Sequence, residues 1–394
     1  MSRADPLGAL RRRLDLELPG VIELRHELHR RPEMSGHETS TRDQVLAALP
    51  GGAATRSVAK TGAVSRIGGS GPAVAVRAEL DALAVAEASE LPWASQHPGV
   101  MHACGHDVHL AALVALCRTV AAVGGPAPLL AVLQPREETY PSGAREIHES
   151  GVLHAEQAEV IVGAHVQPLL PVGTVACTPG TVNASSDEFT IVVRGLGGHA
   201  AYPHHTRDPV FALVQVVVAL QSLVSRRADP MDPVVVSVTT LRAGAAANVV
   251  PDEATARGTV RAIAPDTRQA VLARLIELVD LVARAHGCDA TVEIADGEPA
   301  LVNDPAIAAA TAAVLPSLGA RVDDTLRSTG SDDFAHYSTI MPALMMFVGV
   351  GENDRNERLH SATFVPSDKR VGEVARALLA GYAAAASTLH TPSK

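Results

Sequence analysis

Residues 99–138, GVMHACGHDVHLAALVALCRTVAAVGGPAPLLAVLQPREE, hold a loop, a helix pattern and a strand pattern in direct succession. Apolar residues recur at helical spacing over 107–123, which predicts an amphipathic helix. The run 128–138 is typical of a buried strand that ends in two carboxylates. A helix that leads straight into a buried strand is the repeating unit of α/β proteins. The stretch therefore predicts a mostly parallel sheet flanked by helices.

The same alternation continues on both sides of this stretch. Residues 71–83 are typical of a buried strand that runs into a loop, and residues 158–166 form another short apolar strand pattern. In parallel sheets, ligands bind beyond the carboxyl ends of the strands. Side chains that can bind metal or move protons lie at or just past these predicted strand ends: Asp81, Cys104, His106, Glu137, Glu138 and His165. We therefore expect a site at this edge of the sheet.

The pattern changes from about residue 186. A strand over 186–200 is followed by a helix over 207–226, with Asp208 as its N-cap and Pro209 as its first residue. Two strands, a second helix and a final strand follow, and this order is the split βαβ arrangement of ferredoxin-like domains. We predict an inserted α+β domain over 186–297 and a catalytic, metal-binding α/β domain formed by 1–185 and 298–394.

The composition restricts the classes of partner. The 394 residues are 47% hydrophobic, enough for two globular domains. A formal net charge of −10 and an aromatic content of 3% argue against nucleic acid binding, because a phosphate backbone requires a basic face. Residues 1–20 lack the apolar run of a secretory signal, and no stretch approaches about 20 consecutive apolar residues. With four scattered cysteines, we expect a cytoplasmic protein with reduced thiols and no membrane partner.

Cys104 and His106 admit three interpretations when they are considered alone. Thiolate and imidazole both suit Zn²⁺, so the pair is a candidate for two ligands of one ion. A nucleophilic cysteine assisted by a histidine is the second interpretation. A buried thiol beside a histidine that caps the following helix is the third. The pair does not decide among them.

The acidic pair Glu137–Glu138 and two further histidines favour the metal-site interpretation of Cys104 and His106. Adjacent carboxylates repel each other unless something cationic holds them. His165 and His360 are ordinary histidines when considered singly. Together, however, five side chains would suit a two-metal site in which one ligand is shared between ions: Cys104, His106, Glu138, His165 and His360. Glu137 is then free to take a proton from water.

At this point the chain resembles the family of hippurate hydrolases and indoleacetyl-amino-acid hydrolases. The resemblance runs in the same order from about residue 22 to 370, in the motifs HELHRRPEMSGHET (26–39), RAELDAL, GVMHACGHDVH, QPREE, GAHV, GGHAAYPHHTRDPV, NVVPDEATARGTVR, GSDDFA and LHSATF. It implies a zinc-peptidase-like catalytic domain, an inserted ferredoxin-like domain that forms a homodimer, and hydrolysis of a small anionic N-acyl amino acid. The acyl group would be acetyl, benzoyl or longer.

The resemblance also assigns roles to individual residues. The five side chains above match the family's metal ligands, and Glu137 matches the general base that protonates the leaving amine after a metal-bridging hydroxide attacks. Asp81 is expected to orient a ligand from just outside the site. His199 matches a histidine that stabilises the oxyanion, often from the partner subunit. Asn248 and Arg261 lie in the motif that helps hold the substrate carboxylate.

The resemblance implies two divalent ions per subunit. The cysteine ligand favours Zn²⁺, while relatives of this type accept Mn²⁺, Co²⁺ or Ni²⁺. Two alternatives stay open: a dipeptidase or carboxypeptidase acting on short peptides, and a relative that binds metal without turnover. The retained Glu137 speaks against a pure binder, because binding alone does not require a base.

The chain departs from the family pattern around the acidic pair. Arg136 replaces a small residue, TYPSGA (139–144) replaces a glycine-rich run, and Glu79 and Ala84 replace an aspartate and a proline. Arg136 is expected to form a salt bridge with Glu79 or another acid, and pairing with the substrate carboxylate is the alternative. We interpret the Asp332–Asp333 pair as a cap of the following helix rather than as a substrate contact.

Overall fold

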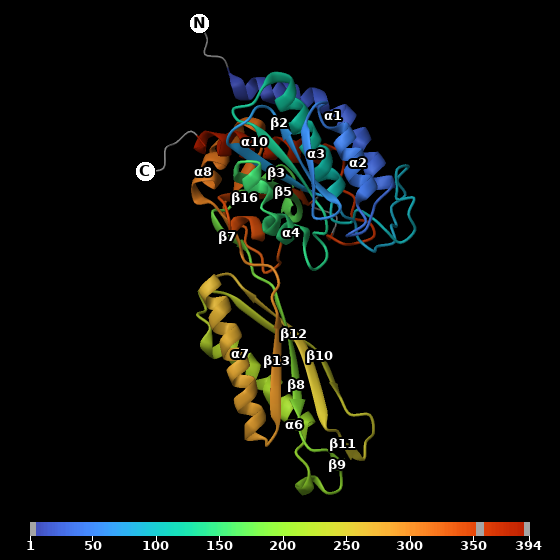
Figure 1. Ribbon diagram of the computed structural model, residues 1–394, viewed down its shortest axis with the longest axis vertical. Coiled ribbons are helices and arrows are strands. Elements are labelled where there is room, and N and C mark those ends of the chain that lie inside the picture. The colour runs from blue at the N-terminus through green and yellow to red at the C-terminus, as the bar shows by residue number, and fades with distance from the viewer. Residues whose placement is uncertain (1–4, 352–357, 390–394) are drawn as a thin grey trace. The chain divides into compact units, whose positions relative to one another are not determined.

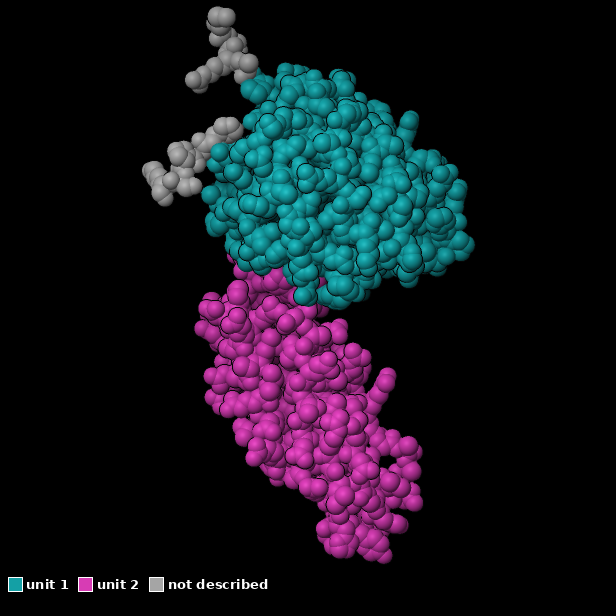
Figure 2. Space-filling model, viewed as in Figure 1, with its two compact units in different colours: residues 1–180, 302–326, 336–394 teal, residues 181–301, 327–335 magenta. Residues whose placement is uncertain are grey.

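The computed structural model describes residues 5–351 and 358–389, and these divide into two compact units (Figure 2). Unit 1 comprises 1–180, 302–326 and 336–394, and unit 2 comprises 181–301 and 327–335. Unit 2 thus contains the whole predicted insertion, 186–297. It also takes in 327–335, which we had predicted to belong to the catalytic domain. The reason is backbone pairing: Ser328 donates to the carbonyl of Val182 and accepts from the N–H of Ala184.

Unit 1 is built on an eight-stranded sheet with the strand order β1-β2-β4-β3-β5-β16-β6-β15. Its elements are α1 (Pro6–Arg30), α2 (Thr39–Ala48), β1 (Ala54–Val58), β2 (Gly62–Ile67), β3 (Ala73–Glu79), α3 (His106–Val123), β4 (Leu129–Gln134), α4 (Gly143–Ser150), α5 (Val152–Ala155), β5 (Ala158–Pro171), β6 (Thr174–Ala176), α8 (Pro305–Val314), β15 (Arg321–Asp323), α9 (Ala335–Ser338), β16 (Ala343–Gly351) and α10 (Lys369–Thr388). The central strands β4, β3, β5 and β16 run parallel, and antiparallel pairs occur at β1/β2, β2/β4 and β6/β16. The predicted mostly parallel α/β sheet is confirmed.

Helix α3 is the centre of the core of unit 1. We had predicted an amphipathic helix, but every residue from His106 to Cys117 is buried, as expected of a helix that other elements enclose. It packs on strands β3 and β4, and the helices α1 and α10 pack against it (Figure 1). This packing fixes the first residue of α3, His106, against the edge of the sheet.

Unit 2 has the predicted split βαβ topology. Its elements are β8 (Asp187–Arg194), β9 (Gly198–His199), α6 (Pro209–Ser222), β10 (Val234–Ala243), β11 (Val249–Val250), β12 (Glu253–Ala262), α7 (Pro265–Ala285) and β13 (Asp289–Ala295). Four strands form an antiparallel sheet in the order β10-β12-β8-β13, on which α6 and α7 pack. The Asp208 side chain accepts hydrogen bonds from the N–H groups of Val210 and Phe211, so the predicted N-cap is confirmed. The short strands β7 (Gly180–Asn183) and β14 (Leu301–Asn303) form a separate two-stranded sheet.

Two helices are long and apolar enough to cross a membrane by length and composition, His106–Val123 and Pro209–Arg227. The first is the core helix α3. The second begins with α6, which lays Leu213, Val216 and Leu220 on the core of unit 2. The absence of a membrane partner stays a prediction.

Candidate metal centre

The sheet register brings the ends of β3 and β4 level with the middle of β5. Glu79 pairs with Gln134, and Arg77 pairs with Gly163, so that Glu79 and His165 lie at the same height of the sheet. We had predicted a strand over 158–166 with His165 at its end. The strand β5 continues instead to Pro171, because its pairing with β16 extends beyond His165. His165 nevertheless lies at the predicted edge, because β3 and β4 end at its level.

A glycine lets Cys104 and His106 converge at the start of α3. Gly105 has φ +83°, a left-handed conformation that glycine adopts without steric cost. A Cβ atom at this position would lie 2.6 Å from Cγ2 of Val166 on β5. The turn therefore requires glycine both for its backbone conformation and for its close approach to the strand.

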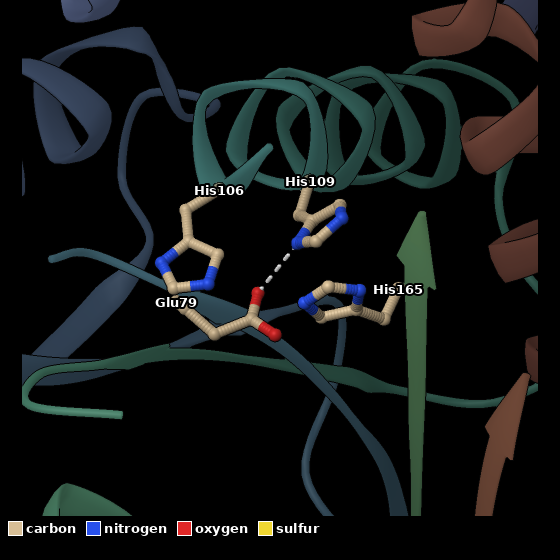
Figure 3. A group of neighbouring side chains, drawn as sticks. All are labelled: Glu79, His106, His109 and His165. Atoms are coloured by element: carbon tan, nitrogen blue, oxygen red, sulfur yellow. Dashed lines mark hydrogen bonds and ion pairs between the residues drawn. The ribbon is translucent and has the colours of Figure 1, made fainter. Parts of the chain in front are cut away.

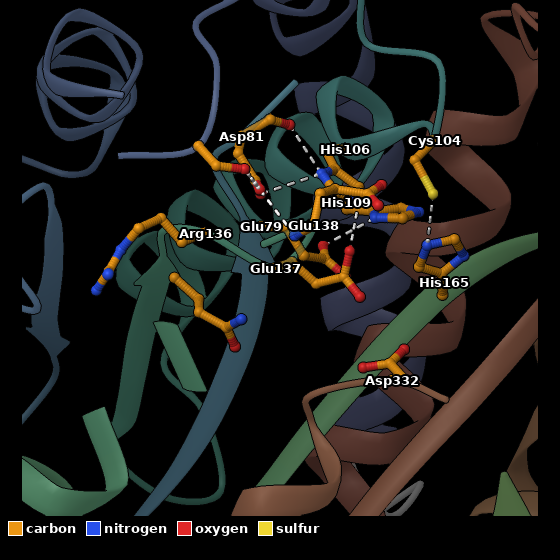
Figure 4. A network of polar contacts seen from close by, with 12 residues as sticks. Glu79, Asp81, Cys104, His106, His109, Arg136, Glu137, Glu138, His165 and Asp332 are labelled. Atoms are coloured by element: carbon orange, nitrogen blue, oxygen red, sulfur yellow. Dashed lines mark hydrogen bonds and ion pairs between the residues drawn. The ribbon is translucent and has the colours of Figure 1, made fainter. Parts of the chain in front are cut away.

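The five predicted ligands lie in one cluster, and Figure 4 shows four of them: Cys104, His106, Glu138 and His165. Ligand atoms of Cys104, His106 and Glu138 lie within 4.8 Å of one another. His165 joins them through its Nε2 atom, 3.4 Å from Sγ of Cys104. His360 joins from the other side, with Nε2 at 3.3 Å from Oε1 of Glu138. Glu138 thus lies between the two groups of ligands, where a shared ligand would be needed.

The hydrogen bonds of two histidines turn one ring nitrogen of each toward the cluster. Nδ1 of His106 donates to the carbonyl oxygen of Asp81 at 2.8 Å, and Nδ1 of His165 donates to that of Val166 at 2.7 Å. The Nε2 atoms are then the nitrogens available to a metal. Burial holds the pKa of His165 well below its ordinary value, so this imidazole is neutral.

His109 lies close to these ligands but has no free nitrogen. Its Nε2 accepts from the N–H of Val166 at 3.0 Å, and its Nδ1 donates to Oε2 of Glu79 at 2.9 Å (Figure 3). His106, His165, His109 and Glu79 could hold an ion by distance alone. Because both nitrogens of His109 are already used, we assign it to support rather than to ligation.

Asp81 orients two ligands through different atoms. Its main-chain carbonyl, rather than its carboxylate, is the nearer acceptor of His106, since the carboxylate oxygen Oδ1 lies 3.5 Å from Nδ1. The carboxylate oxygen Oδ2 instead accepts from the N–H of Glu138 at 3.0 Å and from the hydroxyl of Ser35 at 2.7 Å. Burial alone would raise the pKa of Asp81, but the hydrogen bond and charge of His106 outweigh it and keep the carboxyl ionised.

The cluster fits divalent metal ions on three counts. Its donors are a thiol, imidazoles and a carboxylate, which suit Zn²⁺ and the later first-row metals. Nε2 of His106 and Oε1 of Glu138 are buried and make no hydrogen bond within the described residues. Burial lowers the pKa of His106, yet the bond to Asp81 and the surrounding carboxylates outweigh it and raise it to about 10. The carboxylates that favour the protonated form of His106 also favour a metal cation, which would replace the proton on its ring.

The nucleophilic-cysteine interpretation does not fit the same geometry. Burial, with Glu138 and Glu137 adding to it, raises the pKa of the Cys104 thiol well above its ordinary value. A catalytic cysteine needs the opposite, a surrounding that favours the thiolate. A divalent ion would supply that surrounding, so the thiol is suited to ligation.

Glu137 lies beside the ligands on a tightly held loop. Its Oε2 atom is 3.8 Å from Nε2 of His106, and its side chain is mostly buried. The preceding residue, Arg136, has φ +49° and donates its backbone N–H to Oε1 of Glu38 at 2.9 Å. The guanidinium of Arg136 pairs with Glu146 on α4 and points away from the cluster (Figure 4). The predicted salt bridge to an acid is confirmed, with Glu146 rather than Glu79 as the partner.

Glu79 belongs to a buried network that the sequence analysis did not predict. Its carboxylate pairs with Arg77 and accepts from His109, which in turn holds the N–H of Val166 next to His165. Burial alone would raise the pKa of Glu79, but these two partners hold it well below its ordinary value. The position of His109 one helical turn after His106 is the sequence signal that could have revealed it.

Replacing Glu79 by Gln is expected to lower the free energy of unfolding by about 3–5 kcal/mol. The substitution keeps the size of the side chain but leaves the buried Arg77 without its anion. Urea unfolding measures the loss. The matched control is E253Q, which breaks an exposed pair with Arg194 and should cost less than about 1 kcal/mol. Equal losses in the two variants would refute a supporting role for the network.

His199 and Asn248 lie together in unit 2. β9 and β11 pair through His199 and Val249, and the N–H of Ala200 donates to the carbonyl of Asn248 at 3.0 Å. The His199 ring is exposed, and its Nδ1 accepts from the N–H of Ala201 at 3.1 Å. Nε2 therefore carries the proton of the neutral ring and is a hydrogen-bond donor.

Arg261 lies at the opposite end of the unit 2 sheet from this pair. The β9–β11 ribbon adjoins the start of β12 at Glu253, and Arg261 is the penultimate residue of that strand. From Glu253 to Arg261 a strand advances roughly 26 Å. Asn248 and Arg261 are thus far apart within a single chain, and their shared role at the substrate carboxylate stays a prediction. Arg261 donates to the Ser331 hydroxyl at 2.9 Å.

Asp332, the first residue of the acidic pair after Ser331, lies in the turn that leads into α9, and the role of Asp333 stays a prediction. Oδ1 of Asp332 accepts from the N–H of Phe334 at 2.9 Å, and its carbonyl accepts from Ala335, the first residue of α9. The capping interpretation is confirmed for Asp332.

A cluster of thiol, imidazole and carboxylate donors at the edge of a mostly parallel sheet, with a further carboxylate beside it, is the arrangement expected of a metallohydrolase. Residues 75–379 match the family model of peptidase family M20/M25/M40, and the chain belongs to this family.

Two relatives of known activity are similar over nearly the whole chain. The N-acetylcysteine deacetylase of Bacillus subtilis is 36% identical over 355 residues, which cover 87% of this chain and 90% of the relative. The N-acetyldiaminopimelate deacetylase of Geobacillus thermodenitrificans is 32% identical over 359 residues, 89% and 93% of the two chains. Both relatives hydrolyse amide bonds, so the prediction of an amide-bond hydrolase is confirmed.

A solved structure confirms the fold. A dinuclear metal-binding peptidase of the M20 family from Bacillus subtilis superposes with a TM-score of 0.82 at 31% identity, covering 94% of this chain and 98% of that one.

Proposed function

We propose that the chain is a two-metal amidohydrolase that removes the acyl group from an N-acyl amino acid. The observation that carries this proposal is the position of Glu137. This carboxylate lies beside five candidate ligands and is not needed as a sixth. The two deacetylases named above support the substrate class, since both act on N-acetyl amino acids. The resemblance to hippurate hydrolases and indoleacetyl-amino-acid hydrolases extends the proposed substrate class to benzoyl and longer acyl groups.

Five residues would hold two divalent ions: Cys104, His106, Glu138, His165 and His360. When bound, such ions polarise the amide carbonyl and make water more acidic. The Cys104 thiolate favours Zn²⁺, and the set also accepts Mn²⁺, Co²⁺ or Ni²⁺. We also propose a cytoplasmic location, since the four cysteines are free thiols in the described chain.

Glu137 is proposed to move the proton. It takes a proton from the attacking water and passes it to the amine as the carbon–nitrogen bond breaks. A carboxylate suits both steps, because water held among cations has a pKa lowered to roughly 7. The tight loop held by Arg136 and Gly143, whose N–H donates to the Arg136 carbonyl at 2.9 Å, keeps this carboxylate in place.

His199 is proposed to stabilise the oxyanion from a partner subunit. Its protonated Nε2 is a suitable donor to the oxygen of the tetrahedral intermediate. The separation of His199 and Asn248 from Arg261 favours a homodimer. In such a dimer one substrate would contact Arg261 of one copy and the β9–β11 ribbon of the other copy.

Two exposed features of unit 2 support dimerisation through it. Phe211, Val214 and Val218 form an apolar stripe on α6 that is 54%, 42% and 63% exposed. The adjoining strand β10 is an edge strand with unpaired backbone groups, which can pair with another chain.

A chelator and a thiol reagent distinguish the metal mechanism from the nucleophilic cysteine. We expect EDTA to abolish hydrolysis of a thiol-free N-acetyl amino acid. Iodoacetamide, removed before the assay, should leave the metal-loaded enzyme active because a metal-bound thiolate is protected. The measurement is the hydrolysis rate after each treatment, with the modified cysteines identified by mass spectrometry. Rapid inactivation by iodoacetamide together with indifference to EDTA would assign catalysis to Cys104.

A further inference from the structure

We propose that Arg25 is a positioning residue that holds the segment carrying His360 against the helix carrying His106, and that binding of the second metal ion depends on it. This inference rests on the proposed two-metal function. Arg25 lies in α1, far from both ligands in sequence, and is fully buried. Its Nε donates to Oδ2 of Asp107 at 2.9 Å, its Nη1 to Oδ1 of Asp368 at 2.8 Å, and its Nη2 to the carbonyl of Pro366 at 2.6 Å.

One contact of Arg25 is with Asp107, the residue that follows the ligand His106. Asp107 directly follows His106 in the first turn of α3 and is completely buried. Its Oδ2 atom also accepts from Nδ1 of His29 at 3.1 Å. The guanidinium lies over the Trp93 ring, 5.0 Å from its centroid, which gives the cation a second favourable contact. Arg25 is therefore a fixed point relative to His106.

The other two contacts of Arg25 act on the segment that carries His360. His360 has φ +63°, an uncommon conformation for a residue other than glycine, and its side chain is 50% exposed. Its own packing therefore does little to hold the ring. The segment is held by hydrogen bonds from the N–H of His360 to the Ala103 carbonyl and from Ala88 to Ala362, and by Arg25 at Pro366 and Asp368.

The chemistry of the cation matters to this role. Three acceptors surround the guanidinium, two of them carboxylates on different elements, and its planar set of donors can reach all three at once. A lysine at this position would keep the charge but could not reproduce the fork. Outer residues that orient metal ligands typically change metal affinity by about 10–100-fold when they are replaced.

The test uses D368A, which removes one contact of Arg25 together with the bond between His26 and the same carboxylate, and which leaves the buried pair of Arg25 with Asp107 intact. Zn²⁺ is titrated into the metal-stripped full-length protein, and the two binding constants are measured by competition with a chelator. We expect one ion to bind as in the wild type and the other to bind about 10-fold or more weakly. R25K should change the same constant, as should H360A, which removes the ligand itself.

The matched control is D304A. Asp304 is also an aspartate at the start of a helix of unit 1, where it accepts from the N–H groups of Ala306 and Ile307. Its loss affects a helix cap and no contact of Arg25, so both zinc constants should stay at their wild-type values. Wild-type binding of both ions in D368A and R25K would overturn the role of Arg25. Fewer than two ions on the wild type would overturn the proposed function itself, and the inference with it.

Discussion

The variant E137Q should lower kcat for hydrolysis of an N-acyl amino acid by about 10²–10⁴-fold, the contribution typical of a general acid–base. Gln has the same shape as Glu but cannot accept a proton from water or return one to the amine. Glu137 is outside the proposed ligand set, so the variant should still bind two ions. The measurements are kcat with the metal-loaded protein and the metal content by elemental analysis.

The control for this variant is E149Q, which removes an exposed carboxylate on α4 that pairs with Arg145. It should keep the wild-type rate. A wild-type rate in E137Q would mean that another group moves the proton. Loss of one ion from E137Q would make Glu137 a ligand and would leave the reaction without an assigned base.

The second large effect is expected for H199A, a loss of about 10²–10³-fold in kcat with both ions still bound. The substitution removes an Nε2–H donor that strengthens its bond as the oxyanion forms. The control is H204A, because His204 is a neighbouring exposed histidine in the short turn Pro203–His205. If H199A loses metal, or if H204A loses as much activity, His199 does not have the proposed role.

Mixed dimers show from which subunit His199 acts. When E137Q and H199A chains are produced together, about half of the dimers contain one chain of each kind. If His199 acts on the partner's centre, each mixed dimer has one complete site, and about a quarter of the wild-type activity returns. If His199 acts on the centre of its own chain, no site is complete and no activity returns.

The fold could be predicted from the sequence because its signals are local. The apolar helix pattern over 107–123 and the strand pattern before Glu137 give α3 and β4 within a few residues. The cap at Asp208 gives the start of α6. Cys104, His106, Glu138 and His165 could be found because they lie at or near the ends of such elements at one edge of the sheet. His360 lies outside these elements and was found only in combination with the other four and through the motif LHSATF.

What the sequence could not show depends on partners distant along the chain. Arg25 meets Asp368 across 343 residues, and no local pattern links the two. The continuation of β5 past His165 depends on its pairing with β16, and residues 327–335 join unit 2 through pairing with Val182 and Ala184. The distance between Asn248 and Arg261 follows from the length of a strand that one motif spans, which the resemblance alone does not reveal.

The two-metal mechanism is tested by hydrolysis with chelator-stripped protein before and after addition of Zn²⁺, Mn²⁺ or Co²⁺. The substrates are N-acetyl, N-benzoyl and long-chain N-acyl amino acids, with a dipeptide for the carboxypeptidase alternative. We expect no activity without metal, and release of the free amino acid from an N-acyl substrate once two ions are bound. Hydrolysis that persists without metal would refute the mechanism, as would the absence of hydrolysis of every N-acyl substrate by protein with two ions bound.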